Sequence, residues 1–168
     1  YMSGVEGARC TVEMKKVPRV FFQRPDDLHI FGYTCEEGKR IRRFEEYNPE
    51  LALEWILRDQ QVYKSDCFRI LKEAGIALPV MYDLGFDHNN CLGCVKSSSP
   101  SYWKRIYDHF PDVFERRKLQ SDAIRVKLVK INGVRRSLDA VLTERFIPED
   151  DGDIECGPYC QPTLEGFR

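Results

Sequence analysis

The chain has 168 residues, of which 42% are hydrophobic and 32% are charged, and its formal net charge is -1. This length and composition fit one globular domain and exclude a disordered or fibrous chain. The near-zero net charge gives no whole-molecule argument for binding nucleic acid or an anionic membrane. Because no apolar run is long enough to span a bilayer and there is no signal segment, we expect a cytoplasmic protein without a membrane partner.

The first third of the chain is predicted to contain short strands. A loop and a short helix are expected up to Pro18. Clusters of β-branched and aromatic residues then predict strands over 19–22 and 28–33, because such residues pack well in sheets. The charge-rich segment 36–46 that follows is typical of a solvated helix face.

Helix signals dominate the middle of the chain. Asn48 is followed by proline and glutamate, which predicts a helix start, and the apolar residues of 51–57 are assigned to that helix. Ser65 and Asp66 start a second helix, and Gly75 ends it.

The second half is predicted to combine helices with a β-hairpin. The expected elements are an extended segment over 78–84, helices over 99–110 and 112–122, and a hairpin with Asn132-Gly133 as its turn. From Pro148 the chain is acidic and rich in glycine and proline, which predicts a loop.

The cysteines are the strongest chemical signal. Seven cysteines without a secretion signal fit a reducing compartment, where cysteines are more often ligands or nucleophiles than disulfides. Cys91 and Cys94 form a C-x-x-C, in which Gly93 lets the backbone turn both sulfurs toward one point, and Cys156 and Cys160 form a second close pair. Four thiolates in two pairs suit zinc or an iron–sulfur cluster equally. A redox-active dithiol at the first pair and plain unliganded cysteines are the alternatives.

Two further cysteines receive weaker assignments. Cys67 falls on the apolar face of its predicted helix, which favours a buried core cysteine. It is also the alternative metal ligand if one cysteine of the tail is not used. Cys35 has no partner at metal-ligand spacing and receives no role.

Two groups of basic residues could bind anions, because guanidinium and ammonium groups suit phosphate and sulfate oxygens. The first group, near a strand that ends at Gly32, comprises Arg9, Lys15, Lys16, Arg40 and Arg42. Open α/β sheets bind ligands at such strand ends. The second group surrounds the hairpin turn and comprises Arg125, Lys127, Lys130, Arg135 and Arg136. This second group favours either contact with nucleic-acid phosphates or protection of an edge strand from aggregation.

Four segments carry a family resemblance: RCTVEMKKVP (9–18), GYTCEEGKR (32–40), LPVMYDLGFDHNNCLGCVK (78–96) and YWKRIYDHFPDVFER (102–116). Together they resemble the phosphoadenosine phosphosulfate (PAPS) reductase family, in particular its short versions common in phage and prophage genomes. The resemblance implies an adenine-nucleotide α-hydrolase-like α/β fold, related to ATP pyrophosphatases. On that basis 1–47 would be the C-terminal part of the nucleotide-binding core and 48–168 a helical, cysteine-rich region with the hairpin, in one structural domain overall.

The resemblance also implies site residues. Those beside the nucleotide or its sulfate would be Arg9, Cys10, Lys15 and Lys16, and those framing the same pocket would be Glu37 and Arg40. Family members end in an ECGLH-like motif whose cysteine attacks the sulfate sulfur, and Glu155-Cys156-Gly157 matches its beginning. Because the next residues, Pro158-Tyr159-Cys160, depart from that motif, Cys156 is a candidate nucleophile and also a candidate metal ligand, with the ligand role favoured.

One family feature is absent from this sequence. A glycine-rich phosphate loop of SGGKDS type occurs nowhere in these residues, and the first residue is not methionine. Since such loops cradle phosphates with backbone N–H groups, we interpret the chain as a C-terminal portion with little activity alone. The expected function is PAPS reductase-like sulfur or redox chemistry, with ATP or PAPS as substrate and a thiol reductant as partner. The alternative is a non-catalytic, metal-stabilised module that binds nucleic acid or protein.

Overall fold

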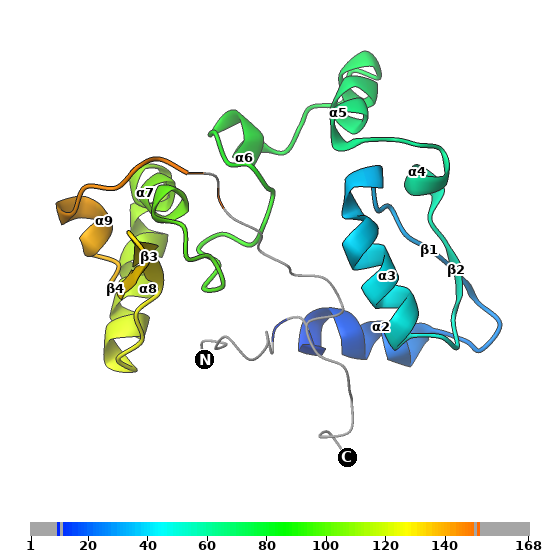
Figure 1. Cartoon of the computed structure of the whole chain (residues 1–168), viewed down its shortest axis with the longest axis horizontal. Coiled ribbons are helices and arrows are strands. Elements are labelled where there is room, and N and C mark those ends of the chain that lie inside the picture. Colours follow the sequence, from blue (N-terminus) through cyan, green and yellow to red (C-terminus); the bar gives the residue numbers. More distant parts are fainter. Residues whose placement is uncertain (1–9, 11, 150, 152–168) are drawn as a thin grey trace. The chain divides into compact units, whose positions relative to one another are not determined.

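The computed structural model describes residues 10, 12–149 and 151. These residues fall into two compact units, 10–78 and 79–151, and each is described by itself (Figure 1). Both units combine helices with a small two-stranded sheet, so the expected mixed α/β class is confirmed. The sequence was also expected to divide after residue 47 into part of a nucleotide-binding core and a cysteine-rich region, and this division stays a prediction. Among the helices of the described ranges, none has the length and apolar character needed to cross a membrane.

The unit 10–78 contains a β-α-β arrangement. β1 (Leu28–Ile30) lies within the predicted strand 28–33 and pairs in parallel with β2 (Ala52–Glu54). Parallel strands need a crossover connection, and α3 (Gly38–Tyr47) lies between them in the chain. The other elements are the π-helix η1 (Val12–Lys16), α2 (Val17–Phe22), the 3-10 helix η2 (Cys35–Glu37), α4 (Ile56–Asp59) and α5 (Lys64–Glu73).

The core of this unit is aromatic and centres on α3. Ile41 and Phe44 are buried on one face of α3 together with Trp55, which follows β2. The ring of Phe31 lies 4.7 Å from that of Phe44 and 5.3 Å from that of Trp55, measured between centroids. The segment predicted as a solvated helix is therefore confirmed, and it also carries an apolar stripe that faces the core.

Two elements predicted for this unit are wrong. Residues 19–22 belong to helix α2 rather than to a strand, because Pro18 in its first turn has a φ that suits a helix. Phe22 is 77% exposed, so no sheet buries the aromatic residues that favoured a strand. Residues 52–54 form β2 rather than a helix, since pairing with β1 outweighs the local start signal at Asn48.

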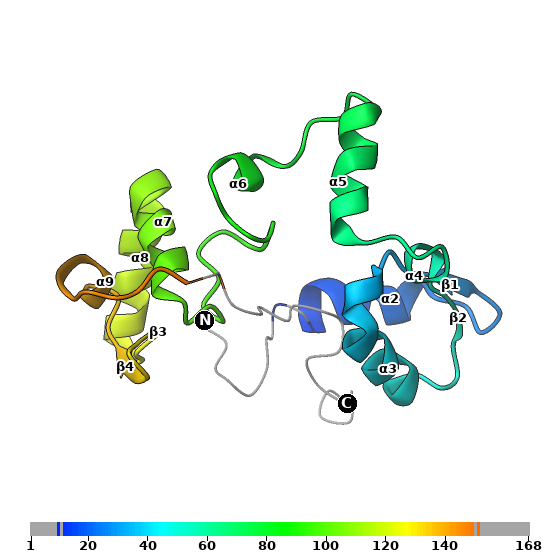
Figure 2. The same cartoon turned by 45° about the horizontal axis from the view of Figure 1, so that its top comes forward.

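The unit 79–151 is built around helices α7 (Pro100–His109) and α8 (Pro111–Ala123), which pack against each other (Figures 1 and 2). Both helices were expected. The hairpin of β3 (Val129–Ile131) and β4 (Val134–Arg136) is also confirmed. Its turn residues Asn132 and Gly133 have φ values of +49° and +81°, as a type I′ turn requires. The short helices are α6 (Val80–Asp83) and α9 (Ala140–Thr143).

The core of this second unit fixes the start of α7. Ser99 caps the helix, because its hydroxyl oxygen accepts the Tyr102 N–H at 3.2 Å. The Trp103 indole N–H donates to the Ser97 carbonyl oxygen at 2.9 Å. The largest buried side chains around these residues are Tyr102, Trp103, Ile106, Phe114, Ile131 and Leu138. The loop that precedes α7 is thus attached to the core by hydrogen bonds as well as by packing.

The extended segment predicted over 78–84 is wrong, because residues 80–83 form helix α6. Pro79 occupies the N-cap position, and Gly85, with a φ of +79°, follows the last turn. Proline before a helix and glycine after it are strong boundary signals. Here the proline and the glycine mark the two ends of a single helical turn. Such a short helix has too few residues to show a helical period in the sequence.

Candidate thiolate site

The C-x-x-C segment forms a loop between α6 and α7, and one side chain holds both of its ends. The Cys94 backbone N–H donates to the Tyr102 hydroxyl oxygen at 2.8 Å. The same hydroxyl donates to the Cys91 carbonyl oxygen at 3.1 Å. Because Tyr102 is buried at the start of a capped helix, its hydroxyl is a fixed point to which the loop backbone is bound.

The second of the two residues between the cysteines must be glycine. Gly93 has a φ of +65°, and a Cβ atom at this position would lie 2.6 Å from Cγ1 of Val113 in α8. Any other residue would therefore suffer both backbone strain and a steric clash. The Arg117 side chain, also from α8, donates its Nε–H to the Gly93 carbonyl oxygen at 2.9 Å. Helix α8 thus packs closely against the turn of the loop and bonds to it.

The environment of Tyr102 keeps its phenol neutral. Burial is the largest influence and raises the pKa of Tyr102 well above its usual range, with the nearby Cys94 acting in the same direction. The Cys94 backbone N–H opposes this shift without reversing it. A phenol that keeps its proton can donate to the Cys91 carbonyl, and it adds no negative charge beside thiolates.

The two thiols of the loop differ in exposure. Cys91 is exposed, whereas Cys94 is half-buried and packs with Leu92 and Val95 against the core. Over the described part of the chain there is no disulfide, and no group of three or more histidine, cysteine or acidic residues is placed to hold a metal. Cys156 and Cys160 lie outside the described residues, so the predicted set of four ligands stays a prediction.

A second contact group lies next to this loop and involves the last described residue. Asp151 is 2% exposed, and its Oδ2 accepts the Asp87 N–H at 2.9 Å. In return, the Asp151 N–H donates to Oδ2 of Asp87 at 2.8 Å. Arg105 of α7 forms an ion pair with Asp151, and its guanidinium lies 3.8 Å from the Asp87 carboxylate. We call Asp87, Arg105 and Asp151 the clasp.

The predicted nucleotide residues are described only in part. Arg9 lies outside the described residues, Cys10 is exposed, and Lys15 and Lys16 lie on η1. The structure does bring Glu37 and Arg40 together, as an ion pair between η2 and the first turn of α3, the two helical elements that follow β1 in the chain. The Glu37 carboxylate also accepts the Thr34 N–H at 3.1 Å. The Arg40 guanidinium lies 4.8 Å from the centroid of the Tyr33 ring.

Cys67 is half-buried on α5, in the unit 10–78. Cys91 and Cys94 belong to the unit 79–151. The role of Cys67 as an alternative ligand therefore stays a prediction.

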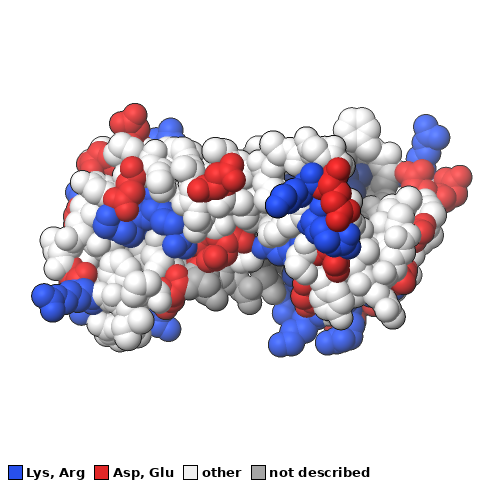
Figure 3. Space-filling model, turned by 90° about the horizontal axis from the view of Figure 1, so that it is seen from above, with Lys and Arg blue, Asp and Glu red and all other residues white. Residues whose placement is uncertain are grey.

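The basic residues of the hairpin are partly engaged within the protein. Arg136 pairs with Glu144 at 2.9 Å, and Arg135 donates to the Leu128 carbonyl oxygen at 2.7 Å. Lys130 lies directly opposite Arg135 in the strand register. On the face of the molecule seen in Figure 3, basic and acidic side chains are interspersed. Contact with nucleic acid stays a prediction for this hairpin.

Sequence reasoning missed the residues that organise the thiolate loop, which are Tyr102, Arg117, Asp87, Arg105 and Asp151. The C-x-x-C is visible because its residues are contiguous, whereas these five lie at scattered positions with no spacing rule that links them to the motif. The only local signal was Ser99-Pro100, which predicts the start of α7 and hence that Tyr102 lies in its first turn.

Comparisons with models of protein families, with curated proteins and with solved structures find no match for this chain.

Proposed function

We propose that Cys91 and Cys94 are thiolate ligands of an iron–sulfur cluster or a zinc ion, in a PAPS reductase-like protein with adenine-nucleotide-dependent sulfur or redox chemistry. The observation that carries the proposal is the Tyr102 hydroxyl, which bonds to the backbone of both cysteines. A loop held in this way loses little conformational freedom when its sulfurs bind a ligand, and such preorganisation favours binding.

The side chains of the loop fit either group. Thiolates are the usual ligands of structural zinc and of iron–sulfur clusters. The exposure of Cys91 leaves one side of the loop open to an incoming ion or cluster. A bound cluster would supply electron transfer, whereas a bound zinc ion would supply a structural link. The remaining ligands in the proposal are Cys156 and Cys160, with Cys67 as the alternative and with Cys156 also the candidate nucleophile.

The nucleotide part of the proposal is supported by the pair of Glu37 and Arg40. Both follow the carboxyl end of β1, and open parallel sheets bind ligands at this edge. The contacts of Arg40 with Glu37 and Tyr33 orient a guanidinium in the segment that follows this strand, and a guanidinium suits phosphate or sulfate oxygens. The other residues proposed for ATP or PAPS are Arg9, Cys10, Lys15 and Lys16, and a thiol reductant is the proposed redox partner.

Anaerobic purification of the full chain, followed by metal analysis and a visible spectrum, tests the thiolate centre. Brown protein with broad absorption supports a cluster, and colourless protein with bound zinc supports a zinc site. Protein that retains neither metal contradicts the proposal. We expect Cys91→Ser and Cys94→Ser each to lose the metal.

Two other cysteines supply controls for this experiment. Cys35 donates its thiol proton to the Arg58 carbonyl oxygen at 3.6 Å in the unit 10–78, so Cys35→Ser is expected to retain the metal. Cys67→Ser distinguishes the ligand set that contains both tail cysteines from the set in which Cys67 replaces one of them. Metal loss in this variant would assign the alternative ligand, and retention would favour the two cysteines of the tail.

Equilibrium dialysis with ATP tests the nucleotide site. We expect Arg40→Gln to weaken ATP binding by about tenfold, the range for loss of one charge-assisted contact. Arg24→Gln is the matched control, because Arg24 is an exposed arginine between α2 and β1. Equal affinity for the wild type and Arg40→Gln would remove Arg40 from the proposed site.

A further inference from the structure

The outer face of the β3–β4 hairpin places two cations directly opposite each other. The register pairs Lys130 with Arg135, and the Lys130 N–H donates to the Ser98 carbonyl oxygen at 2.8 Å rather than across the hairpin. The two residues therefore form a non-hydrogen-bonded pair, the kind in which opposite side chains lie closest. Both are exposed, whereas Val129 and Ile131 are buried in the core. Like charges directly opposite each other destabilise a hairpin, and a bound anion would remove this cost.

The surrounding segment does not neutralise this pair. Residues 124–136 include no acidic residue, and the further basic residues Arg125 and Lys127 are exposed. Arg136 is already paired with a glutamate. Within the described residues, no ion pair is formed by Arg125, Lys127 or Lys130. We call Arg125, Lys127, Lys130 and Arg135 the hairpin cations.

Arg135 is oriented by a contact of its own. Its guanidinium donates to the Leu128 carbonyl oxygen at 2.7 Å. A guanidinium has five N–H donors in a planar fork, and this bond uses one of them. The remaining donors are available to a ligand, and their geometry matches the oxygens of a phosphate group.

Arg125 occupies a position that favours glycine. Its φ is +56°, its N–H donates to the Asp122 carbonyl oxygen at 3.0 Å, and the Val126 N–H donates to the Ser121 carbonyl oxygen at 2.9 Å. These are the two bonds of a Schellman motif at the end of α8, in which the left-handed residue is usually glycine because a Cβ atom is unfavourable there. A charged, exposed residue kept in a strained conformation points to a role outside the fold.

Protection of an edge strand does not account for these charges. β4 has three residues, and very short edge strands already discourage pairing with another chain. On the other side of the hairpin, the Lys130 N–H is occupied by the Ser98 carbonyl. Arg125 and Lys127 precede β3 and belong to neither strand. The hairpin cations therefore suit an anionic partner better than they suit edge protection.

The composition of the segment selects among anionic partners. Residues 124–136 include no aromatic residue. Surfaces that bind single-stranded nucleic acid stack bases on aromatic rings, and segments that lie in a membrane interface carry Trp or Phe. A nucleic-acid duplex requires neither. The major groove of B-form DNA admits a two-stranded β-ribbon, whereas the major groove of an RNA duplex is deep and narrow.

We propose that the β3–β4 hairpin, through the hairpin cations, binds the phosphate backbone of double-stranded DNA. The inference is independent of the thiolate centre and of the nucleotide site, because none of the hairpin cations belongs to either. Contacts with phosphates carry no sequence information, so binding is expected to be independent of base sequence. If all four cations contact phosphates, the logarithm of the association constant should fall with the logarithm of the salt concentration with a slope of about −3.6.

Fluorescence anisotropy of a labelled DNA duplex of mixed sequence, titrated with the full chain at low salt, tests the proposal. Lys130→Glu replaces the like-charged pair by an ion pair with Arg135, so it should stabilise the hairpin. The same variant should weaken DNA binding by about tenfold or more and make the salt slope shallower by about one. A residue with a merely structural role would not change stability and binding in opposite directions.

Arg125→Gly applies the same logic at a second position. Glycine relieves the strain at the end of α8, so hydrogen exchange there should become slower. The lost charge should weaken DNA binding and make the salt slope shallower by about one. Slower exchange with unchanged DNA affinity would remove Arg125 from the binding surface.

A matched control separates a local effect from that of net charge. Arg24→Gln/Arg69→Gln lowers the net charge by the same amount as Lys130→Glu, at two exposed positions of the unit 10–78. We expect this variant to bind the duplex as the wild type does. An equal loss of affinity in the two variants would show that total charge is responsible, and would overturn the proposal.

The choice of probe decides the class of partner. No binding of the duplex at low salt would overturn the proposal. Tighter binding of single-stranded DNA, polyglutamate or vesicles of anionic lipid than of the duplex would assign the surface to another partner and would also overturn it. Because the assay does not depend on metal, a chain that binds the duplex but retains neither zinc nor a cluster would refute the proposed function and leave this inference standing.

Discussion

The hydroxyl of Tyr102 lies 2.8 Å from the backbone nitrogen of Cys94 and 3.1 Å from the carbonyl oxygen of Cys91. One buried phenol therefore satisfies a donor and an acceptor three residues apart, on either side of a turn. Because Tyr102 holds the backbone of both cysteines, the geometry of the C-x-x-C should depend on a residue outside the motif.

Removal of this hydroxyl gives the first prediction. Tyr102→Phe leaves the Cys94 N–H and the Cys91 carbonyl without their partner, and we expect it to lower the free energy of unfolding of the unit 79–151 by about 1–3 kcal/mol. This change is measured by following the hydrogen exchange of the α7 and α8 amides at increasing urea concentrations. Tyr107→Phe is the control, since it makes the same chemical change on an exposed residue of the same helix. Equal stabilities of the two variants would contradict the role of the bridge.

The turn of the loop gives the second prediction. Gly93→Ala combines a φ of +65° with a Cβ atom 2.6 Å from Val113, so we expect a loss of about 2–4 kcal/mol and displacement of α8 from the loop. Gly85→Ala shares the positive φ, at +79°, but has no atom within 4 Å of its Cβ, and should cost only about 1 kcal/mol. The difference between the two variants, measured by the same exchange experiment, isolates the steric contribution.

Shortening the opposing side chain completes this test. The double variant Gly93→Ala/Val113→Ala should recover part of the lost stability, because the clashing Cγ1 is gone. Strictly additive losses from the two substitutions would show that contact with α8 is not the cause.

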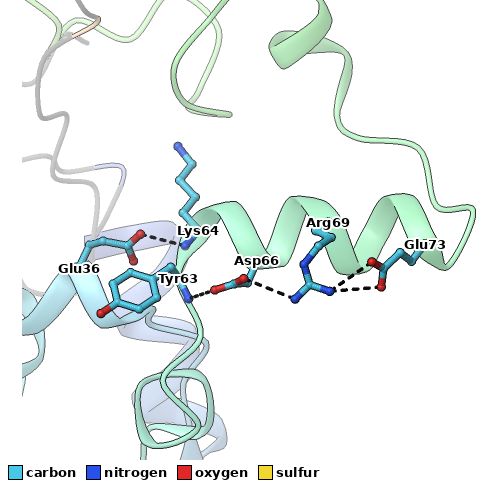
Figure 4. Close-up of polar contacts among 6 residues, drawn as sticks. All are labelled: Glu36, Tyr63, Lys64, Asp66, Arg69 and Glu73. Carbon is cyan, nitrogen blue, oxygen red and sulfur yellow. Dashed lines mark hydrogen bonds and ion pairs between the residues drawn. The ribbon is translucent and has the colours of Figure 1, made fainter.

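The third prediction concerns pH and the start of α5 (Figure 4). The Glu36 carboxylate accepts the Lys64 N–H at 2.9 Å, and this bond lowers the pKa of Glu36 below its usual value of 4.5. A pKa that is lower in the folded state stabilises the fold above the unfolded value, and that stability is lost as the pH falls through the folded value. The pH-dependent contribution of Glu36 should therefore be full near neutrality and decline below about pH 4.5.

Glu36→Gln keeps an oxygen acceptor but cannot titrate. The stability difference between the wild type and this variant, measured for α5 by hydrogen exchange, should shrink as the pH is lowered. Glu46→Gln, at an exposed position of α3, is the control. A difference that stays constant with pH would show that the Glu36 charge does not contribute.

The fourth prediction tests the aromatic core of the unit 10–78. Phe44 is fully buried and contacts Phe31 and Trp55, so Phe44→Ala should cost about 3–5 kcal/mol. Phe22→Ala makes the same change at a position that is 77% exposed, and should cost less than about 0.5 kcal/mol. Exchange of the α3 amides measures both. Similar losses in the two variants would mean that α3 does not depend on this core.

Several elements could be read from the sequence because their causes are local. The start of α7 depends on Ser99 bonding to a residue three positions away. The end of α5 depends on the left-handed Gly75, with a φ of +69°, and the hairpin depends on the pair Asn132-Gly133. Each signal acts within a few residues, and no distant contact opposes it.

Other elements were missed because distant contacts decide them. Asn48 and the proline after it signal a helix, but the residues from Ala52 pair with β1, which lies twenty-four residues earlier. The alternation of Leu51, Leu53 and Trp55, which all pack in the same core, was a strand pattern that the local helix signal concealed.

The features of the thiolate site likewise fall into those with local causes and those decided by distant contacts. The sequence alone determined that Cys91 and Cys94 form a turn-compatible pair, because spacing and the glycine between them are properties of contiguous residues. Only the tertiary structure decided what holds that pair. The Tyr102 hydroxyl, Val113 and Arg117 of α8, and the bonds between Asp87 and Asp151, sixty-four residues apart, come from positions that fall together only when the helices pack. Hydrogen bonds across such separations leave no pattern in a sequence, since any buried tyrosine or aspartate could supply them.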